Sequence, residues 1–227
     1  LYDEKVYIEC NFEQINEIKN LLSKYILRKD IILHTKNDLI SIPVFDKKIS
    51  QDLSQANGVK KLEKYNKLLF YIDPRNIRMG ARLVGERKEV NNFFVSNKLA
   101  YDIKDEYNKR RIELCIPEPI IDLEYNKSFI LEYNFEQING VSFSKGCYIG
   151  QENTARLKYR GNIKRSLKKV KLVKGNMPDI GSALYLNNNE VGIMKSSYEN
   201  LGLALIKTQL FEKGARLKNQ NSLLEVE

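Results

Sequence analysis

The chain has 227 residues, a net charge of +9 at neutral pH and 42% hydrophobic residues. This length suggests one large or two modest domains that can bury a core without disulfide or metal staples. The composition excludes a disordered chain, and no apolar stretch is long enough to cross a membrane. Three cysteines without a CxxC pair argue against a secreted disulfide scaffold and favour a reducing, cytosol-like compartment. Because the chain starts with Leu1 rather than Met, we expect an upstream piece to be missing.

The first part of the chain predicts strands around one amphipathic helix. Residues 4–10 alternate apolar side chains on one face, which is typical of a half-buried strand. Asn11 then predicts a helix cap, followed by an apolar stripe. The stripe consists of Ile15, Ile18, Leu22 and Ile26. Residues 27–34 and 38–45 favour two more strands, and residues 46–66 are polar and helix- or loop-like.

The middle of the chain predicts two strands and a second helix. Residues 67–73 and 81–86 favour strands, and the first of them closes at the turn Asp73-Pro74. Residues 98–113 favour a helix that Pro117 and Pro119 end. The inward side of this helix would carry Ile103, Tyr107 and Ile112.

Residues 120–146 are hard to assign, but one hexapeptide in them occurs twice. Residues 134–139 repeat residues 11–16 letter for letter. The flanking sequences do not match, so we interpret the repeat as one helix-start pattern used twice rather than as a duplicated unit.

The pattern changes after Gly161, where short β-rich runs are separated by Gly, Asn and Pro. The runs are 167–173, 183–186, 190–195 and 201–207. Their spacing predicts a small antiparallel barrel or sandwich behind a mixed α+β part. We therefore expect a domain boundary near residue 163, which divides the chain into residues 1–163 and 164–227.

The positive charge is concentrated in one strip, residues 145–174. This strip holds ten Lys or Arg and one acid, Glu152, whereas the rest of the chain is balanced. A basic strip can steer nucleic acid, the glutamate tail of a folate or an acidic protein. It can equally be a solvated helix and strand edge, and only Tyr148 and Tyr159 interleave it as base-stacking aromatics.

The residue inventory excludes several kinds of catalysis. The one histidine, His34, removes zinc sites and iron sites that need several histidines. Residues 80–85 lack the Gly-Lys-Ser/Thr ending of a phosphate-binding loop, and no GxGxxG is present. Nucleotide hydrolysis and dinucleotide redox chemistry therefore have no support.

Cys147 is the cysteine with functional potential, whereas Cys10 and Cys115 lie among apolar residues and favour burial. Cys147 follows Lys145-Gly146 and precedes a predicted helix that runs toward Arg160. Amide N–H groups at a helix start and a nearby cation favour a thiolate. A structural helix-start cysteine is the plain alternative. One thiolate cannot hold an iron–sulfur cluster alone, so a partner would supply the remaining ligands.

Three ordered motifs between residues 73 and 165 resemble the YgfZ family, which includes the mitochondrial Iba-type assembly factors. The run Lys145-Gly146-Cys147-Tyr148-Ile149-Gly150-Gln151-Glu152 is similar to the family signature KGC-[Y/F]-x-GQE, and Thr154-Ala155-Arg156, Arg160-Gly161 and Lys164-Arg165 continue the likeness. Asp73-Pro74-Arg75 with Gly80 and Arg82 resembles its DPR…GxR element, and Arg111-Ile112-Glu113 with Ile116-Pro117 resembles its R-I-E-x-G-I-P element. Cys115 stands where the family usually has Gly.

The resemblance implies an α+β fold with aminomethyltransferase-like, folate-binding lobes followed by a small antiparallel β-barrel. The N-terminal strands and helix of family members have no counterpart in this chain, so we expect the folate-binding domain to be N-terminally incomplete. A tetrahydrofolate or related folate would need a stacking aromatic and cations. The candidate cofactor-binding residues are Tyr107, Asp73, Arg75, Arg82 and Arg111; core packing and loop salt bridges are the plain alternatives for Tyr107, Arg75 and Arg82.

The function implied by the resemblance is a folate-linked factor for assembly or repair of [4Fe–4S] clusters in client enzymes, including radical enzymes that modify tRNA. Cys147 would ligate a transient [2Fe–2S] cluster shared with an A-type carrier protein, in the bacterial cytoplasm or the mitochondrial matrix. The residues with roles in this chemistry would be Lys145, Gly146, Cys147, Tyr148, Gly150, Gln151 and Glu152. The alternatives are a tetrahydrofolate-dependent aminomethyl or one-carbon transferase, and a protein that makes weak tRNA contacts through residues 156–174. No membrane partner is expected.

Overall fold

The chain divides into two compact units, which are described separately. Unit 1 comprises residues 1–73 and 80–101, and unit 2 comprises residues 74–79 and 102–227. The computed structural model describes residues 5–26, 30–46, 49–50, 53, 60–61, 67–99, 103–148, 150–161, 163–210 and 212–227. No helix in these described residues is long and apolar enough to cross a bilayer. The domain boundary expected near residue 163 stays a prediction.

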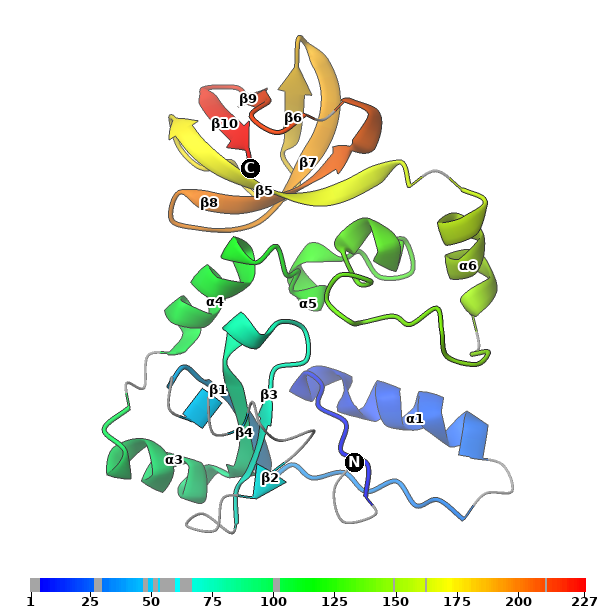
Figure 1. Ribbon diagram of the computed structural model, residues 1–227, viewed down its shortest axis with the longest axis vertical. Coiled ribbons are helices and arrows are strands. Elements are labelled where there is room, and N and C mark those ends of the chain that lie inside the picture. The colour runs from blue at the N-terminus through cyan, green and yellow to red at the C-terminus, as the bar shows by residue number, and fades with distance from the viewer. Residues whose placement is uncertain are drawn as a thin grey trace. The chain divides into compact units, whose positions relative to one another are not determined.

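Unit 1 is built on an antiparallel four-stranded sheet. Its strands are β1 (Leu39–Val44), β4 (Ala81–Glu86), β3 (Leu69–Ile72) and β2 (Lys60–Lys61), in this spatial order (Figure 1). The strands expected at 38–45, 67–73 and 81–86 are therefore confirmed. Most of residues 46–66 lie outside the described residues, and β2 is a strand that the sequence analysis did not predict.

Helix α3 (Arg87–Ser96) packs on this sheet, and the sequence analysis missed it. Its Val90, Phe93 and Phe94 are buried, and the Phe93 ring meets the edge of Phe70 on β3 with centroids 5.3 Å apart. Glu86 makes no side-chain cap bond, so β4 continues into α3 without a helix-start signal that sequence could reveal. Gly85 on β4 leaves room for the Leu68 side chain, because a Cβ at position 85 would lie 2.4 Å from Leu68 Cδ2.

The N-terminal strand prediction is wrong, whereas the helix prediction is confirmed. Residues 6–10 form no regular structure, and Val6 and Ile8 are 71% and 58% exposed. Alternation alone does not make a strand, because its N–H and C=O groups also need a neighbouring strand. The described residues 30–34 likewise form no strand, and residues 27–29 lie outside the described residues.

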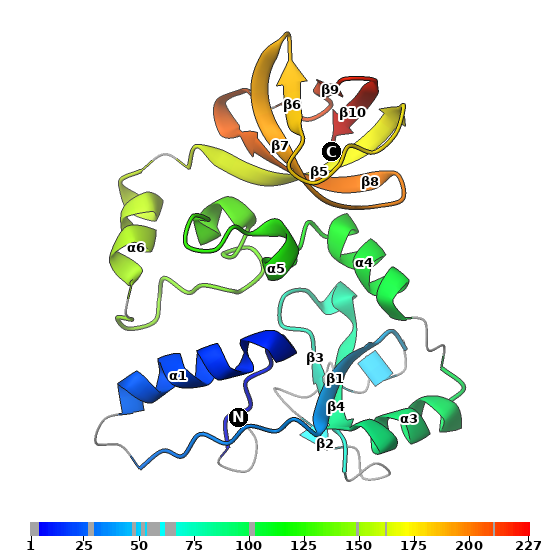
Figure 2. The ribbon, with the colours of Figure 1, turned by 180° about the vertical axis from the view of Figure 1, so that it is seen from behind.

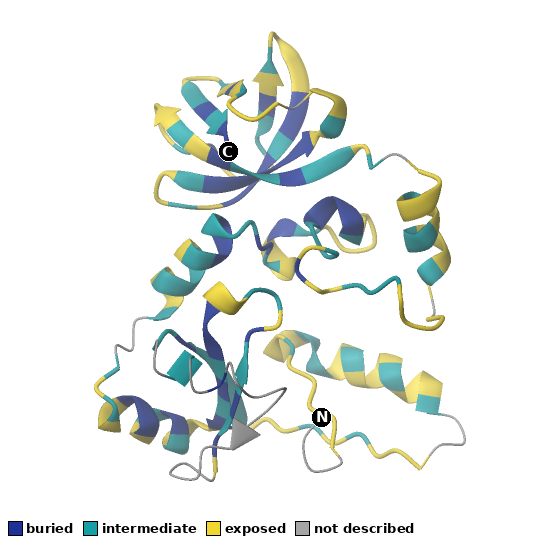
Figure 3. Ribbon diagram, viewed as in Figure 1, coloured by how far each residue is buried: buried dark blue, intermediate teal, exposed yellow. Residues whose placement is uncertain are grey.

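The Asn11 side chain does cap a helix start. It accepts the Glu13 N–H at 3.0 Å at the beginning of η1 (Phe12–Gln14), which leads into α1 (Ile15–Ile26). The expected apolar stripe is half-buried, and no residue of α1 is fully buried (Figure 3). The apolar side chains of this stripe are therefore only partly shielded from solvent.

Unit 2 begins with helical segments. These are η3 (Ile77–Met79), α4 (Ile103–Glu113), α5 (Pro119–Asp122), η4 (Ile130–Tyr133) and α6 (Gln151–Tyr159). The helix expected from residue 98 begins later, because Lys98 has φ +53° after the end of α3. It also ends before the prolines: the Ile116 and Cys115 N–H groups bond Arg111 O and Ile112 O at 2.7 and 3.0 Å, which is a Schellman closure.

The repeated hexapeptide adopts two different structures, so our interpretation of a shared helix start is wrong. Asn11 precedes η1 in an extended conformation, whereas Asn134 follows η4 with φ +63°. Residues 134–139 form turns rather than a helix. The same letters therefore begin one helix and end another, because their neighbours in the fold differ.

The C-terminal part of unit 2 is a closed antiparallel barrel, as expected. Its strands run in the order β10-β5-β8-β7-β6-β9 (Figures 1 and 2). Their bounds are β5 (Arg165–Lys174), β6 (Ala183–Leu186), β7 (Asn189–Tyr198), β8 (Leu201–Lys207), β9 (Arg216–Asn219) and β10 (Ser222–Val226), with η5 (Thr208–Leu210) after β8. The barrel core includes Val170, Leu184, Met194, Ile206 and Leu224.

Candidate functional site

Cys147 lies on an exposed loop directly before α6. The helix begins at Gln151, and Gly150 forms its N-cap with φ +86°. The prediction that a helix opens here is confirmed, although Cys147 itself precedes the helix. Its thiol therefore does not share a helix face with Gln151.

The other predicted residues of this loop are also accessible. Lys145, Gly146, Tyr148, Gly150 and Glu152 are exposed, and Gln151 is half-buried. The Gln151 side chain accepts the Tyr148 N–H at 3.1 Å. This bond closes the loop just after Cys147.

The base of the loop is held by contacts between α6 and the segment before the loop. The Lys158 ammonium contacts both carboxylate oxygens of Glu136 at 2.6 Å and lies 5.3 Å from the Phe143 ring centroid. Phe143 in turn meets Tyr159 edge-to-face, with centroids 5.9 Å apart. The segment before the loop is thus packed against the C-terminal end of α6, while residues 144–148 of the loop are exposed.

The glycines beside Cys147 have open space around them. A Cβ built on Gly146 or Gly150 would meet no atom within 4 Å. At Gly150 the positive φ requires glycine, whereas Gly146 shows no such backbone constraint. Another molecule can therefore approach the main chain closely on the Cys147 side of the loop.

Among the residues that the structure describes, Cys147 has no companions that would complete a metal site. In the described part of the chain, no three His, Cys, Asp or Glu side chains come together in a group that could hold a metal ion. Any cluster that Cys147 ligates would take its remaining ligands from elsewhere.

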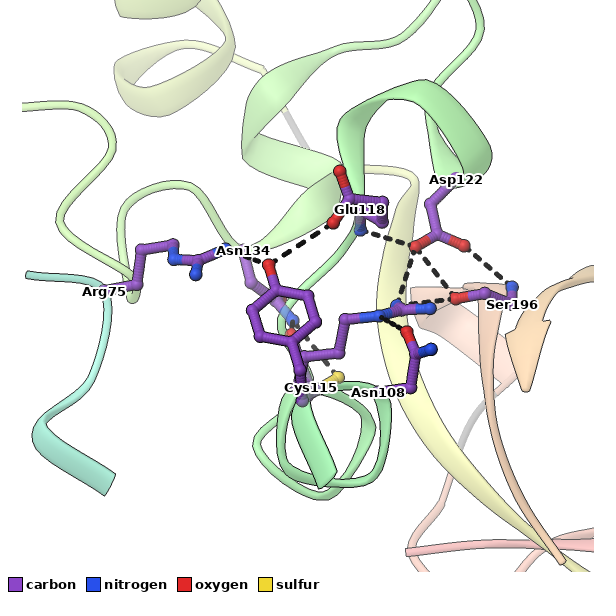
Figure 4. Close-up of polar contacts among 9 residues, drawn as sticks. Arg75, Asn108, Cys115, Glu118, Asp122, Asn134 and Ser196 are labelled. Carbon is purple, nitrogen blue, oxygen red and sulfur yellow. Dashed lines mark hydrogen bonds and ion pairs between the residues drawn. The ribbon is translucent and has the colours of Figure 1, made fainter. Parts of the chain in front are cut away.

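Two predicted folate residues, Arg75 and Tyr107, do meet in unit 2. The Arg75 guanidinium donates to the Tyr107 hydroxyl at 3.2 Å and lies 5.8 Å from the ring centroid. The Tyr107 hydroxyl donates to Glu118 Oε2 at 3.4 Å, and Figure 4 draws these contacts as dashed lines. The cluster offers an aromatic ring and a cation side by side, which is the pair of groups that a folate needs.

Arg111, in contrast, is buried among protein partners. Its side chain donates to Asn108 at 3.0 Å, to Asp122 Oδ2 at 3.3 Å and to Ser196 Oγ at 2.8 Å (Figure 4). Arg111 is 2% exposed and Asp122 is fully buried. This placement favours a structural role, because the guanidinium compensates a buried carboxylate.

A β-bulge in β7 brings Ser196 into the hydrogen-bond network of Arg111 and Asp122. The β7–β8 register shifts between Met194 and Ser197, so Lys195 and Ser196 leave the regular ladder. The Ser196 N–H and hydroxyl then donate to Asp122 at 2.7 and 2.9 Å. Lys195, which is 4% exposed, lies 3.7 Å from Glu124 and 5.7 Å from the Tyr133 ring centroid.

Cys115 occupies the left-handed position that closes α4, with φ +56°. Its Sγ accepts from Asn134 Nδ2 at 3.3 Å, and the same amide also bonds Leu167 O at 3.2 Å (Figure 4). Burial raises the pKa of the Cys115 thiol to about 11. The expectation that Cys115 is a packed residue rather than a reactive one fits this environment.

Asp73 and Arg82, the remaining predicted folate residues, belong to unit 1. Asp73 is buried, and its N–H donates to Gly80 O at 3.0 Å. Arg82 pairs with Glu9, which also accepts from the Tyr71 hydroxyl. Gly80 has φ +79°, and a Cβ there would lie 2.7 Å from Val44 O, so this element of the sequence has a structural reason to contain glycine.

Some cations of the basic strip, residues 145–174, form ion pairs, and others do not. Lys158, Arg165 and Lys169 pair with Glu136, Glu132 and Glu227. The exposed cations that show no acidic partner within 4 Å among the described residues include Lys145, Arg156, Arg160 and Lys164. They lie on the Cys147 loop, on α6 and in the connection to β5, so the available positive charge lies mostly around α6.

Comparison with known proteins identifies relatives of this chain, one of which matches it over nearly its whole length. It is 30% identical to the mouse mitochondrial iron–sulfur cluster assembly factor IBA57 over 223 residues, which cover 96% of this chain and 60% of the mouse protein. It is 36% identical to human IBA57 over 139 residues, or 59% of this chain and 38% of the human protein. It is 39% identical to the tRNA-modifying protein YgfZ of Pectobacterium carotovorum over 94 residues, or 41% of this chain and 26% of that protein. IBA57 and YgfZ proteins are thus homologues of this chain.

The fold has a counterpart among solved structures. The glycine cleavage system aminomethyltransferase T of Bartonella henselae superimposes with a TM-score of 0.54 at 10% identity, over 71% of this chain and 48% of that one. This similarity and the closed barrel confirm the expected α+β, aminomethyltransferase-like fold. No model of a known protein family matches the chain. The chain spans about 60% of the length of its mouse relative.

Proposed function

We propose that this chain acts in the assembly or repair of iron–sulfur clusters and that Cys147 is the residue that contacts the cluster. The observation that carries the proposal is the exposed Cys147 on an open loop between two segments, the one around Phe143 and α6, that pack against each other. The names of the mouse and human relatives support the same function.

The proposed chemistry is ligand sharing. Cys147 would lose its thiol proton to solvent as a bond forms between Sγ and an iron of a [2Fe–2S] cluster carried by an A-type partner. The exposed Lys145 and the free N–H groups of the first turn of α6 would stabilise the thiolate. The partner would supply the other ligands, since Cys147 has no companions among the described residues.

The residues around Cys147 would then have separate tasks. Gly146 would let the partner approach the main chain, and Gly150 provides the backbone turn that begins α6. Gln151 would position the loop through its bond to the Tyr148 N–H. The cations on α6 would attract an acidic partner or an RNA-bound client, such as a [4Fe–4S] enzyme that modifies tRNA, in line with the name of the Pectobacterium relative.

Folate binding forms a second part of the proposal, limited to residues that fit it. Tyr107 would stack on the ring system, and Arg75 would pair with an anionic group of the ligand. Arg111 does not fit, because three protein partners already engage its buried guanidinium. A folate, when bound, would supply one-carbon chemistry.

An anaerobic absorption titration with a [2Fe–2S]-loaded A-type carrier tests the cysteine role. We expect a new charge-transfer spectrum and a 1:1 complex for the wild type and for Cys10→Ser, a matched control with a half-buried thiol outside the loop. Cys147→Ala should give neither. Identical spectra for wild type and Cys147→Ala would show that Cys147 is not a cluster ligand. The alternative to test would then be tetrahydrofolate-dependent one-carbon transfer.

A further inference from the structure

A second polar site in unit 2 contains none of the residues of the Cys147 loop. It is a pocket of about 360 Å³ at the junction of η3, the end of α4 and strand β5. Its polar lining consists of Arg78, Glu113, Lys169, Lys171, Asn200 and Glu227. The volume is in the range of small-molecule sites.

The charges of this lining leave two cations available. Lys169 contacts Glu227 at 2.8 Å, and this bond, together with the positive field of Lys171, holds the pKa of Glu227 below its ordinary value. Arg78 and Lys171 are exposed and have no acidic partner within 4 Å among the described residues. With Glu113 included, the side chains of the lining comprise three cations and two carboxylates, and Arg78 and Lys171 are the cations available to an anion.

Arg78 is held in place through its main chain. Its N–H donates to Asn76 Oδ1 at 3.0 Å, and its C=O accepts from Arg110 NH1 at 3.1 Å. These bonds fix the backbone of η3 while the guanidinium remains in the pocket wall. A fixed arginine is well suited to a phosphate, because its planar N–H groups can bind two oxygens at once.

Glu113 and Asn200 favour a phosphate that carries hydroxyl groups. A free phosphate dianion would be repelled by the Glu113 carboxylate. A ribose 2′-hydroxyl, in contrast, can donate a hydrogen bond to it, and the 2′-hydroxyl is the group that separates RNA from DNA.

The cations outside the pocket favour a strand over a single nucleotide. Lys164 lies just before β5, and Arg160 and Arg156 lie at the end of α6 and within it; all three are exposed, and α6 leads into β5 along the chain (Figure 1). At about 3.3 Å per residue, Lys164 lies roughly 20 Å along the chain from Lys171. One small molecule cannot reach both, whereas a nucleic acid strand can.

We propose that the Arg78–Lys171 pocket binds a phosphodiester of a single RNA strand, with Glu113 accepting a hydrogen bond from the adjacent ribose. Other phosphates of the strand would bind Lys164 and the cations of α6. This inference does not depend on Cys147.

Equilibrium binding of a labelled single-stranded oligouridine at several salt concentrations tests the pocket. We expect Arg78→Gln and Lys171→Gln each to flatten the slope of log affinity against log salt by about 0.7, the value for one phosphate contact with a single strand. Lys174→Gln is the matched control, because Lys174 is an exposed cation of β5 outside the lining. Glu113→Gln should reduce the preference for RNA over DNA of equivalent sequence.

Three results would overturn the inference. The first is equal binding and salt dependence for Arg78→Gln, Lys171→Gln and Lys174→Gln. The second is equal affinity of the wild type for RNA and DNA. The third is release of the RNA by inorganic phosphate at equal ionic strength, which would indicate a site for a free anion. Cys147→Ala should bind RNA as the wild type does, so this test and the cluster titration fail independently.

Discussion

The Ser196 main-chain N–H donates to Asp122 Oδ1 over 2.7 Å, and this bond exists because β7 is bulged at Ser196. A regular ladder would direct that N–H toward a neighbouring strand of the barrel. The bulge instead turns it toward α5, where Asp122 also accepts the Glu118 N–H at 2.7 Å. Asp122 therefore fastens the helical segment to the barrel within unit 2.

Asp122→Asn should be strongly destabilising. The amide would remove the charge that compensates Arg111 and turn an N–H₂ group toward donors of the buried network. We expect the free energy of unfolding to fall by about 3–5 kcal/mol, as for other buried pairs that lose one partner. Denaturant unfolding measures it, with the exposed Asp179→Asn as control; a loss no larger than that of the control would contradict the network.

Arg111→Met tests whether this arginine binds folate or stabilises the fold. We expect it to lower stability as Asp122→Asn does, because it leaves the Asp122 carboxylate buried without its cation. Combined with Asp122→Leu, it should cost less than the two single losses added together, because no unpaired charge stays buried, although the Ser196 and Glu118 donors lose their acceptor. Denaturant unfolding of the single and double variants gives the coupling; strictly additive losses would show that the two residues act separately.

Cys147 and Cys115 should differ sharply in thiol reactivity. Cys147 is exposed, whereas Cys115 is shielded and burial raises its pKa to about 11. In a thiol-reagent assay on the native protein at mildly alkaline pH, Cys147 should be modified first and Cys115 only on unfolding. Equal labelling rates for the two cysteines would refute this difference.

The raised pKa of Cys115 also makes stability depend on pH: its thiol contributes stability below pH 9 that is lost as the pH rises toward about 11.

Cys115→Gly should be at least as stable as Cys115→Ala, although it removes one more carbon atom. At φ +56° a residue with a Cβ is strained by about 1–2 kcal/mol, and glycine avoids that strain. Both variants lose the contact between Sγ and Asn134, so their comparison isolates the backbone effect. The measurement is thermal or denaturant unfolding, and an alanine variant more stable than the glycine variant would argue against strain at this turn.

Tyr71 should titrate late. Burial, followed by the hydrogen bond to Glu9, raises its pKa from 10.0 to about 12. Because the folded state favours the neutral phenol, the associated stability is present below pH 10 and is lost as the pH rises to about 12. The phenolate absorption of the wild type minus that of Tyr71→Phe should show this transition, and Glu9→Gln should move it to lower pH. A difference spectrum that titrates near pH 10 would be incompatible with the buried arrangement.

The sequence by itself determined the parts of the protein that depend on local pattern. Turn residues between β-rich runs predicted the barrel strands β5 to β8, although not β9 and β10. Asn11 predicted the start of η1 and α1, and the Lys145–Glu152 motif resembled a family and predicted the helix that became α6. Each of these signals lies within a few consecutive residues, so it can be recognised without knowing which distant residues meet in the fold. The same local logic failed at residues 4–10, where alternation predicted a strand that has no ladder.

Only the tertiary structure decided which side chains meet. Arg111 looked like a ligand residue in the sequence, yet its partner Ser196 lies 85 positions away and is available only because β7 is bulged. The pocket likewise combines Arg78 with Lys171 and Glu227, which come from three separate parts of the chain. Buried charges and ligand pockets are made of such long-range contacts, because a buried charge needs a partner in space rather than in sequence.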